Sequence, residues 1–314
     1  MSQVEKLSKP ATEKVMDLNT AIKKFVTNGC YLCWGGFADR ASIASVFEIA
    51  RQGIKDLVIA TETDTFMQTS VLMGLGLVKK YEFAYCWSAI WGPDQVFRRA
   101  AEQGIPRSVE LEEYSNYAAS LRFLAGSLGV NFLPTKSLLG SDIPKYNKKI
   151  KIIDDPYTGE PVALVPASRP DVAITHVQRA DAIGNAQIFG YVANDETIVR
   201  AAKRVIITCE EIVPTSEIRR LPNLTYIPYY CVDAVVEVPF GSHPRGVPYY
   251  YYHDVPFGLQ LPKRWKTEDG FNKWAEEWIL GTKDWNEYCN RVGWDRLNAL
   301  ARIERKFQVY GEAR

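Results

Sequence analysis

Two glycines that follow a short apolar stretch are the first feature of this chain that could support chemistry. Tyr31–Trp34 is apolar, it ends at Gly35 and Gly36, and a helical pattern begins after Ser42. This order predicts a strand, a glycine turn and a helix, and open α/β sheets bind ligands at the carboxyl ends of their strands. Glycine lets backbone N–H groups approach a ligand closely. We therefore expect an acyl oxygen or a carboxylate at this turn, although a tight turn without a ligand is the simpler alternative.

The residues around the turn suggest more specific roles. Ser42 is expected to be the N-cap of the helix, because a serine side chain can accept a hydrogen bond from the first helical turn. Arg40 carries a fork of N–H donors that suits a carboxylate, so it could bind the distal carboxylate of a dicarboxylic acid. The alternative for Arg40 is an ordinary surface arginine.

Two glutamates are candidates for a carboxylate that acts in this chain. Glu62 lies in the loop at residues 61–64, after a second apolar strand, and Glu113 precedes the most regular helical pattern in the chain. The simpler interpretation of Glu62 is a loop acid exposed to solvent. For Glu113 it is an acid near a helix N-terminus, where the helix dipole favours negative charge.

The histidines and cysteines favour structural roles. His243 lies in a Gly-Ser-His-Pro segment, and we interpret it as a hydrogen-bonded turn residue. No two histidines are spaced i, i+4 and no acidic cluster accompanies them, so no metal site is predicted. Cys30 and Cys33 form a C-x-x-C within the apolar strand, away from a helix N-terminus. We expect both to be buried and reduced.

The composition limits the class of protein. The 314 residues are 46% hydrophobic, which is enough for a substantial core. Thirty-eight basic and 37 acidic residues give a net charge of +1 without a basic block, which favours neither nucleic acid nor an anionic membrane. No run approaches the roughly 18 apolar residues of a membrane-spanning helix. The polar residues 1–13 do not look like a secretory signal, so we predict a cytoplasmic protein.

Strands and helices are expected to alternate along most of the chain, which predicts a mostly parallel sheet flanked by helices. Expected strands are 31–34, 57–60, 81–87, 108–111, 172–176, 205–209 and 234–238, and expected helices include 18–28, 42–53, 93–104, 115–128 and 195–202. The alternation breaks between residues 134 and 166, where we expect exposed loops and a β-hairpin with Thr158 and Gly159 near its tip.

The sequence from residue 247 onward is much richer in aromatic residues. It contains a run of four tyrosines at 249–252 and then five tryptophans. Aromatic side chains anchor both cores and interfaces. We therefore expect residues 1–246 to form an α/β domain and residues 247–314 to form a helical arm that packs on that domain or on a second subunit.

Three further segments, at residues 179–186, 201–213 and 232–244, resemble the family I coenzyme A-transferases when they are taken together with residues 28–40. The resemblance covers nearly the whole chain and is greatest to the A (alpha) subunits of that family. It implies the family's α/β fold and a transfer of coenzyme A between an acyl-CoA and a carboxylic acid, such as the dicarboxylate glutaconate.

The resemblance also implies a partner. The alpha subunits of the family work with a homologous B (beta) subunit in a hetero-oligomer such as (αβ)2 or (αβ)4, and coenzyme A enters as a substrate thioester. The thioester is attacked by a glutamate of the beta subunit, and coenzyme A then passes through a glutamyl-CoA intermediate to the acceptor acid. The Ser-Glu-Asn-Gly type of segment that usually carries this glutamate is absent here, so the partner is expected to supply it.

Several site residues follow from the resemblance rather than from spacing. Substrate-binding residues would be Gly35, Gly36, Phe37, Arg40, Ser42, Gly140 and Ser141. The last two resemble a Gly-Ser pair that lines the acyl pocket of relatives, although a simple turn is the alternative. Glu62 lies where the sister subunit would carry its glutamate, and ring-opening hydrolases of this fold place a working glutamate near Glu113. Ile43 stands where the family usually has a proline, which leaves the acid substrate open.

Other functions remain as alternatives. The same fold also supports CoA-dependent C–C hydrolases and glutaconyl-CoA-type decarboxylases, which the sequence of the beta subunit would distinguish from a transferase. A non-catalytic sensor of acyl-CoA is less favoured, because no helix-turn-helix segment or basic face precedes the first strand. A nicotinamide dehydrogenase lacks support, because no G-x-G-x-x-G follows a strand.

Overall fold

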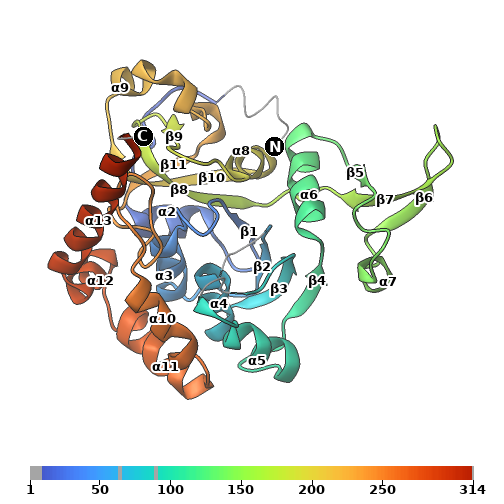
Figure 1. Ribbon diagram of the computed structural model, residues 1–314, viewed down its shortest axis with the longest axis horizontal. Helices are drawn as coiled ribbons and strands as arrows, with labels where there is room; N and C mark the ends of the chain where they lie inside the picture. Colours follow the sequence, from blue (N-terminus) through green and yellow to red (C-terminus); the bar gives the residue numbers. More distant parts are fainter. Residues whose placement is uncertain (1–8, 63–65, 88–90, 313–314) are drawn as a thin grey trace.

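The chain is organised around one large, mostly parallel β-sheet, shown in Figure 1. The computed structural model describes residues 9–62, 66–87 and 91–312. The order of the main strands is β11-β10-β8-β1-β2-β3-β4, and the short β9 pairs antiparallel with β8. The strands are β1 (Tyr31–Trp34), β2 (Leu57–Ala60), β3 (Val78–Phe83), β4 (Glu110–Glu113), β8 (Val172–Ala180), β9 (Ala186–Gln187), β10 (Arg204–Ile212) and β11 (Ala234–Glu237). The predicted fold class is confirmed.

Side chains alternate between the two faces of the sheet, and each face belongs to a separate apolar cluster. Leu32 and Trp34 of β1 pack with α2 (Leu18–Phe25), α3 (Ile43–Arg51) and α4 (Phe66–Gly74). Cys33 points to the other face and packs with residues of α8 (Asp195–Ala201). A period of two along a strand produces this division, and it explains why a short apolar strand can be buried on both faces.

The strand order reverses between β1 and β8. From β1 the chain proceeds through β2, β3 and β4 on one side, whereas β8, β10 and β11 lie on the other side. Both neighbours of β1 run parallel to it. Such a reversal leaves a crevice at the carboxyl ends of the two central strands, which is where open α/β sheets bind their ligands.

The helices fall close to their expected positions. In α6 (Asn116–Leu128) the hydroxyl of Ser115 accepts a hydrogen bond from the N–H of Ala118, and the helix ends at Gly129 in the left-handed region. Two further helices precede the aromatic C-terminal segment, α5 (Gln95–Gln103) and α9 (Thr215–Arg220). Short 3-10 turns lie at Pro222–Leu224 and Tyr229–Cys231.

Two strands lie a few residues away from their expected positions. The expected strand 81–87 is β3 at residues 78–83, and the expected strand 108–111 is β4 at residues 110–113. Charged residues within these two strands obscured the apolar pattern from which strands were predicted. Lys80 of β3 lies against Glu110 and Glu112 of β4 at 2.8 and 2.6 Å, so these charges pair inside the sheet.

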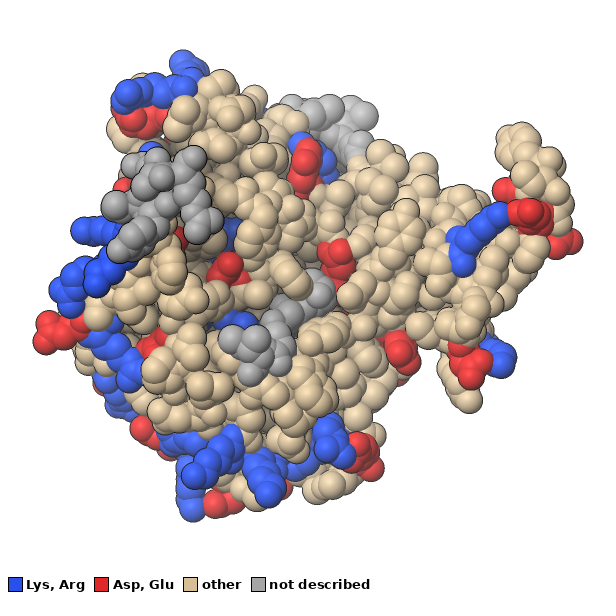
Figure 2. Space-filling model, in the orientation of Figure 1, with Lys and Arg blue, Asp and Glu red and all other residues tan. Residues whose placement is uncertain are grey.

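A second, smaller sheet stands beside the large one, and we call it the lateral sheet. It contains β5 (Phe132–Thr135), β7 (Pro161–Pro166) and β6 (Lys151–Asp154), all antiparallel, with the short helix α7 (Ile143–Tyr146) nearby. Figures 1 and 2 show it projecting from the body of the molecule. The predicted hairpin is confirmed as β6 and β7, and Thr158 and Gly159 lie in the turn between them.

The aromatic C-terminal segment packs against helices of the same chain. Its helices are α10 (Val255–Arg264), α11 (Glu268–Ala275), a π-helical turn (Glu276–Leu280), α12 (Trp285–Val292) and α13 (Trp294–Glu312). Phe47 of α3 meets the rings of Trp274, Trp285 and Tyr288 at centroid distances of 6.1, 5.7 and 5.2 Å. The division of the chain at residues 246 and 247 stays a prediction. Among the described residues, no helix has the length and apolar character needed to cross a bilayer.

Truncation of Phe47 tests whether these aromatic contacts hold the C-terminal helices in place. Phe47→Ala removes a fully buried ring, and such changes cost about 3–5 kcal/mol. We expect a matching loss in the free energy of unfolding in urea. Tyr117→Ala is the control, because this ring is 60% exposed and should change stability by less than about 0.5 kcal/mol. Equal losses for both variants would contradict the packing described here.

Candidate functional site

The turn after β1 requires glycine at both of its central positions. A Cβ on Gly35 would come within 2.3 Å of Oδ1 of Asp195 and 2.4 Å of the hydroxyl oxygen of Thr175. Gly36 has a φ of +81°, and a Cβ there would lie 2.7 Å from the carbonyl oxygens of Asp39 and Arg40. The turn is therefore packed tightly against β8 and the start of α8.

Asp195, the first residue of α8, binds the turn through its buried carboxylate. This carboxylate accepts hydrogen bonds from the N–H of Gly36 at 3.0 Å and from both terminal nitrogens of Arg40, at 2.9 and 3.3 Å. The hydroxyl of Thr175 donates a further short bond. Burial, the largest influence, raises the pKa of Asp195, but Arg40 and these donors together hold the pKa below its ordinary value.

Arg40 is fully buried, so the alternative of a surface arginine is wrong. Its guanidinium faces Asp195 and also donates to the carbonyl oxygen of His176 at 3.3 Å. The partner that engages Arg40 lies 155 residues away in the sequence, and no local pattern could reveal it. Binding of a substrate carboxylate by Arg40 stays a prediction, and such a carboxylate would compete with Asp195.

The backbone N–H groups of Gly35 and Gly36 both donate hydrogen bonds within the chain. That of Gly35 donates to the carbonyl oxygen of Ile174 at 3.0 Å, and that of Gly36 donates to Asp195. These two N–H groups are therefore not available to a ligand in this structure, and the expected acyl oxygen or carboxylate at the turn stays a prediction. The reason is that β8 continues past the end of β1 and covers one donor, while α8 covers the other.

Ser42 occupies the N-cap position of α3 but makes no capping hydrogen bond through its side chain. Its hydroxyl instead lies 2.9 Å from the hydroxyl of Thr208 on β10, and Ser42 is fully buried. The predicted capping role of its side chain is wrong, because a long-range polar partner replaces the local one. Its role in substrate binding stays a prediction.

Phe37 is the exposed apolar side chain of the turn. It is 42% exposed and meets the ring of Tyr191 edge-on at 6.4 Å. The hydroxyl of Tyr191 donates to the carbonyl oxygen of Phe37, and Asp39 pairs with Nε2 of His253 at 2.5 Å. These contacts hold Phe37 at the surface beside the crevice, where an acyl chain could contact it.

Glu62 follows β2 and is partly buried rather than exposed, so its interpretation as a solvent-exposed loop acid is wrong. Its carboxylate accepts a short hydrogen bond from Ser120 of α6, and Ser120 also accepts one from Asn194 at 3.3 Å. Burial raises the pKa of Glu62, the charge of Asp195 adds to that effect, and Ser120 opposes it. Residues 63 and 64 of the expected loop lie outside the described residues.

The glycine turn, Asp195 and Glu62 therefore gather at the carboxyl ends of adjacent strands, at the point where the strand order reverses. A family model described as coenzyme A transferase matches residues 15–238. The chain belongs to the coenzyme A transferase family.

Similarity to individual proteins agrees with this assignment. The chain is 43% identical over 300 residues to an uncharacterised protein of Archaeoglobus fulgidus, covering 95% of this chain but only 66% of that protein. It is 38% identical over 301 residues to the A subunit of glutaconate CoA-transferase from Acidaminococcus fermentans, covering 90% of this chain and 93% of the relative. The crystal structure of that transferase matches with a TM-score of 0.85, at 37% identity, over 91% of this chain and 95% of the other.

A third relative acts on another acid according to its name. The chain is 34% identical over 279 residues to the A subunit of 3-oxoadipate CoA-transferase from Pseudomonas knackmussii, covering 89% of this chain and 98% of the relative. The resemblance to A subunits of the coenzyme A transferase family is thereby confirmed.

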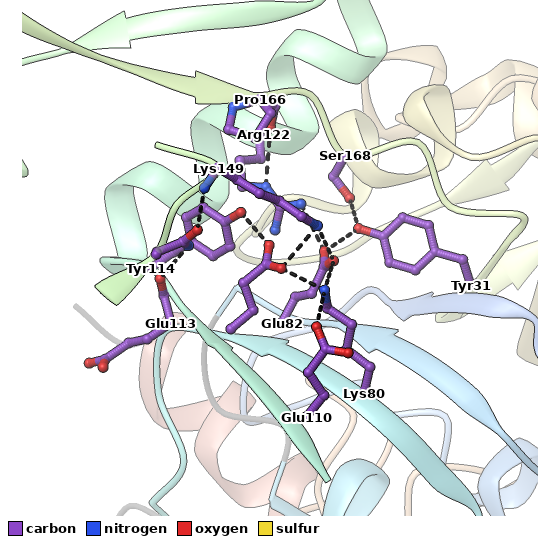
Figure 3. A network of polar contacts seen from close by, with 12 residues as sticks. Tyr31, Lys80, Glu82, Glu110, Glu113, Tyr114, Arg122, Lys149, Pro166 and Ser168 are labelled. Atoms are coloured by element: carbon purple, nitrogen blue, oxygen red, sulfur yellow. Dashed lines mark hydrogen bonds and ion pairs between the residues drawn. The ribbon is translucent and has the colours of Figure 1, made fainter. Parts of the chain in front are cut away.

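Glu113 lies at the end of the edge strand β4. It pairs with Phe83 of β3 in the sheet and lies two residues before Ser115, the N-cap of α6, so it is a strand residue close to the start of that helix. It is exposed and lines a groove of about 410 Å³ between β4 and the segment that contains α7. Figure 3 shows its carboxylate pointing away from the neighbouring ion pairs. A catalytic role for Glu113 stays a prediction.

Gly140 and Ser141 lie in the turn between β5 and α7 of the lateral sheet. Both are exposed, and the hydroxyl of Ser141 donates to the carbonyl oxygen of Leu138 at 3.0 Å. The structure therefore does not place them at the glycine turn after β1. The geometry is that of a simple turn, and a contact with an acyl group stays a prediction.

His243, Cys30 and Cys33 have the structural environments that the sequence predicted. His243 is buried, with Nε2 3.0 Å from Asp254 and Nδ1 2.7 Å from the hydroxyl of Tyr288. Burial lowers the pKa of His243 despite the opposing effect of Asp254. Cys30 and Cys33 are buried, and neither is in a disulfide bond in the described part of the chain. Within the described parts of the chain, no group of three or more potential metal ligands was found.

A network of charges, buried around Glu82 and Glu112 and half exposed at Lys149, joins the lateral sheet to the main sheet (Figure 3), and the sequence did not reveal it. Glu82 of β3 accepts hydrogen bonds from Tyr31 at 2.6 Å and from Arg122 at 2.8 Å. Lys149, beside the lateral sheet, lies 2.9 Å from Glu112 and 3.5 Å from Glu82. Burial raises the pKa of Glu112, but hydrogen bonds from Lys80, Tyr114 and Lys149 lower it to about 2.

Replacing Asp195 should free the glycine turn and leave the buried Arg40 without its charged partner. Removing one partner of a buried ion pair typically costs about 3–5 kcal/mol, so Asp195→Asn should lower the free energy of unfolding by a similar amount. The neighbouring Glu196→Gln is the matched control, because Glu196 makes only a partly exposed pair with Arg200 and should cost less than about 1 kcal/mol. Chemical denaturation of both variants measures the difference, and equal stabilities would argue against the anchoring role of Asp195.

The lowered pKa of Glu112 predicts how the free energy of unfolding changes as the pH falls. Its pKa is lower in the folded chain, at about 2, than the ordinary value of 4.5. Its contribution to stability is therefore complete above pH 4.5 and is lost as the pH falls toward 2. Glu112→Gln should flatten the pH dependence of unfolding in that interval. Glu217→Gln, at an exposed pair on α9, should leave the slope unchanged. If the slope persists in Glu112→Gln, other carboxylates cause it.

Proposed function

We propose that this chain is the A subunit of an acyl-CoA:carboxylate CoA-transferase that acts on a dicarboxylic acid such as glutaconate. The observation that carries the proposal is the match to the A subunit of glutaconate CoA-transferase, which extends over 90% of this chain and 93% of the relative. The similarity to the A subunit of 3-oxoadipate CoA-transferase supports a dicarboxylic acceptor more generally.

The proposal includes a homologous beta subunit, in an assembly such as (αβ)2 or (αβ)4, in the cytoplasm. A glutamate of the partner attacks the thioester carbonyl and releases the thiolate of coenzyme A, which leaves an acyl-glutamyl anhydride. The thiolate then attacks the glutamyl carbonyl and releases the first acid, and the glutamyl-CoA thioester passes coenzyme A to the acceptor acid by the reverse steps. Coenzyme A is a substrate here rather than a resident cofactor.

This chain would contribute a rigid wall of the acyl site. The glycine turn is fixed by Asp195 and cannot widen without breaking the pair with Arg40. Phe37 offers an apolar surface beside it. Glu62, partly buried and held by the hydroxyl of Ser120, adds a polar group whose pKa is raised by burial.

Isotope exchange tests the activity. The chain would be co-expressed with the product of the neighbouring gene, and transfer of label between a free acid and its acyl-CoA would be measured. Exchange should occur only when both chains are present. Net release of free coenzyme A or of carbon dioxide would instead show the hydrolase or decarboxylase reaction of the alternatives, and binding of acyl-CoA without turnover would indicate a sensor.

The location of the nucleophile gives a separate prediction. In the presence of acyl-CoA, borohydride or hydroxylamine should modify a glutamate of the partner and leave this chain unmodified, as mass spectrometry of the two chains would show. Glu62→Gln and Glu113→Gln should each lower kcat by less than about tenfold, because neither carboxylate forms the covalent intermediate. Loss of trapping in either variant, with the complex still assembled, would show that the nucleophile lies in this chain.

A further inference from the structure

Among the residues that the structure describes, the strand β6 forms an open edge of the lateral sheet. The strand order there is β5-β7-β6, so β6 pairs with β7 on one side. All four of its residues are exposed, including Ile152 at 54% and Ile153 at 43%. Isoleucine on an open edge is unfavourable in water and invites pairing with another strand. The lateral sheet also projects from the body of the molecule (Figure 2), so a large partner can approach this edge.

The backbone alternation of β6 defines which of its groups face outward. The N–H of Asp155 donates to the carbonyl oxygen of Glu160 at 2.8 Å, so residue 155 directs its backbone toward β7. Ile153 lies opposite Val162 in the same register and shares that direction. Because backbone groups alternate along an antiparallel strand, Ile152 and Asp154 direct their N–H and C=O groups to the open side.

The position of a proline agrees with this assignment. Asp154 lies opposite Pro161 of β7. Proline has no N–H to donate, and it fits there because the two residues form a pair without hydrogen bonds between their backbones.

The edge is complementary to itself in one antiparallel register. If a twofold axis passes beside Ile153, the outward N–H and C=O groups of Ile152 form hydrogen bonds with those of Asp154 of the second copy. Ile153 then faces Ile153 of the second copy, and Lys151 faces Asp155 of the second copy. Opposite charges and apolar pairs directly across two strands are each favourable. The next allowed register, centred on Ile152, would instead place Lys151 opposite an isoleucine.

We propose that β6 is an interface for a second copy of this chain. Pairing joins the two lateral sheets into one six-stranded sheet, and the contact is isologous, as twofold symmetry requires. Lysine on an edge strand often prevents pairing. Here the charge of Lys151 is instead matched by Asp155 of the second copy, on the same face as the central isoleucine pair. The proposal is independent of the reaction that the chain catalyses.

A cysteine at the twofold axis gives a direct test. In a pair without backbone hydrogen bonds the two Cα atoms lie about 4.5 Å apart, which is within the range for a disulfide. The full-length Ile153→Cys variant should therefore form a covalent dimer on mild oxidation, seen by non-reducing electrophoresis. In Ile152→Cys the two Cα atoms would be about 9 Å apart, from two steps along the strand and one across it, so its yield should be at least about tenfold lower.

Controls address the native thiols and the identity of the partner. The parent chain, treated in the same way, reports any linkage through the six native cysteines, of which Cys86 is not fully buried. The proposal is overturned if neither variant forms a dimer of this chain, if the two variants link equally, or if Ile153→Cys links to a different protein in a co-purified complex.

A proline tests the hydrogen bonds of the proposed interface. Ile152→Pro removes an outward N–H without removing a bond to β7, so it should abolish cross-linking through Cys at position 153, whereas Ile152→Ala should retain it. Lys151→Glu should lower the yield, because Glu would face Asp155 of the second copy. Lys148→Glu, outside the strand, is the matched charge control. Circular dichroism verifies that each variant is folded, and cross-linking that persists in folded Ile152→Pro contradicts the proposed pairing.

Discussion

The buried pair of Arg40 and Asp195 is the interaction on which the candidate site depends. It joins the turn after β1 to the start of α8, and Asp195 also holds the N–H of Gly36 and the hydroxyl of Thr175. Burying two charges is costly, and such a pair persists only where further hydrogen bonds satisfy it. Its main effect is therefore geometric, because the shape of the turn cannot change unless several donors to one carboxylate are lost together.

This constraint explains an unusual stretch of backbone. Ala38 and Arg40 both lie in the left-handed region, with φ of +59° and +55°, which residues with a Cβ seldom adopt. Such conformations cost about 1–3 kcal/mol each and persist where the surroundings fix them. The ion pair fixes Arg40, and the bonds from Tyr191 and His253 fix the residues before it. The result is that Phe37 is held at the surface beside the crevice instead of folding into the core.

The sequence predicted the features that depend on neighbouring residues and missed those that depend on distant ones. The glycine turn, the helix α6 and the hairpin of the lateral sheet all follow from local periodicity and turn residues, and the structure contains them. The burial of Arg40 depends on Asp195, and the hydroxyl that meets Ser42 lies on β10. Those partners become neighbours only when parallel strands assemble, so composition and spacing cannot identify them.

The environments of the two candidate carboxylates bear on which chain supplies the nucleophile. A carboxylate attacks a thioester only when it is ionised and freed from tightly held water. Glu62 is partly buried, but burial and the nearby charge of Asp195 raise its pKa, so the proton that it would have to lose is held more tightly. Glu113 has the opposite environment, because it lies exposed on an edge strand where water solvates its charge. In Glu62 burial works against the charged form, and in Glu113 exposure works against desolvation. A carboxylate of a partner that closes over the crevice could combine charge with desolvation.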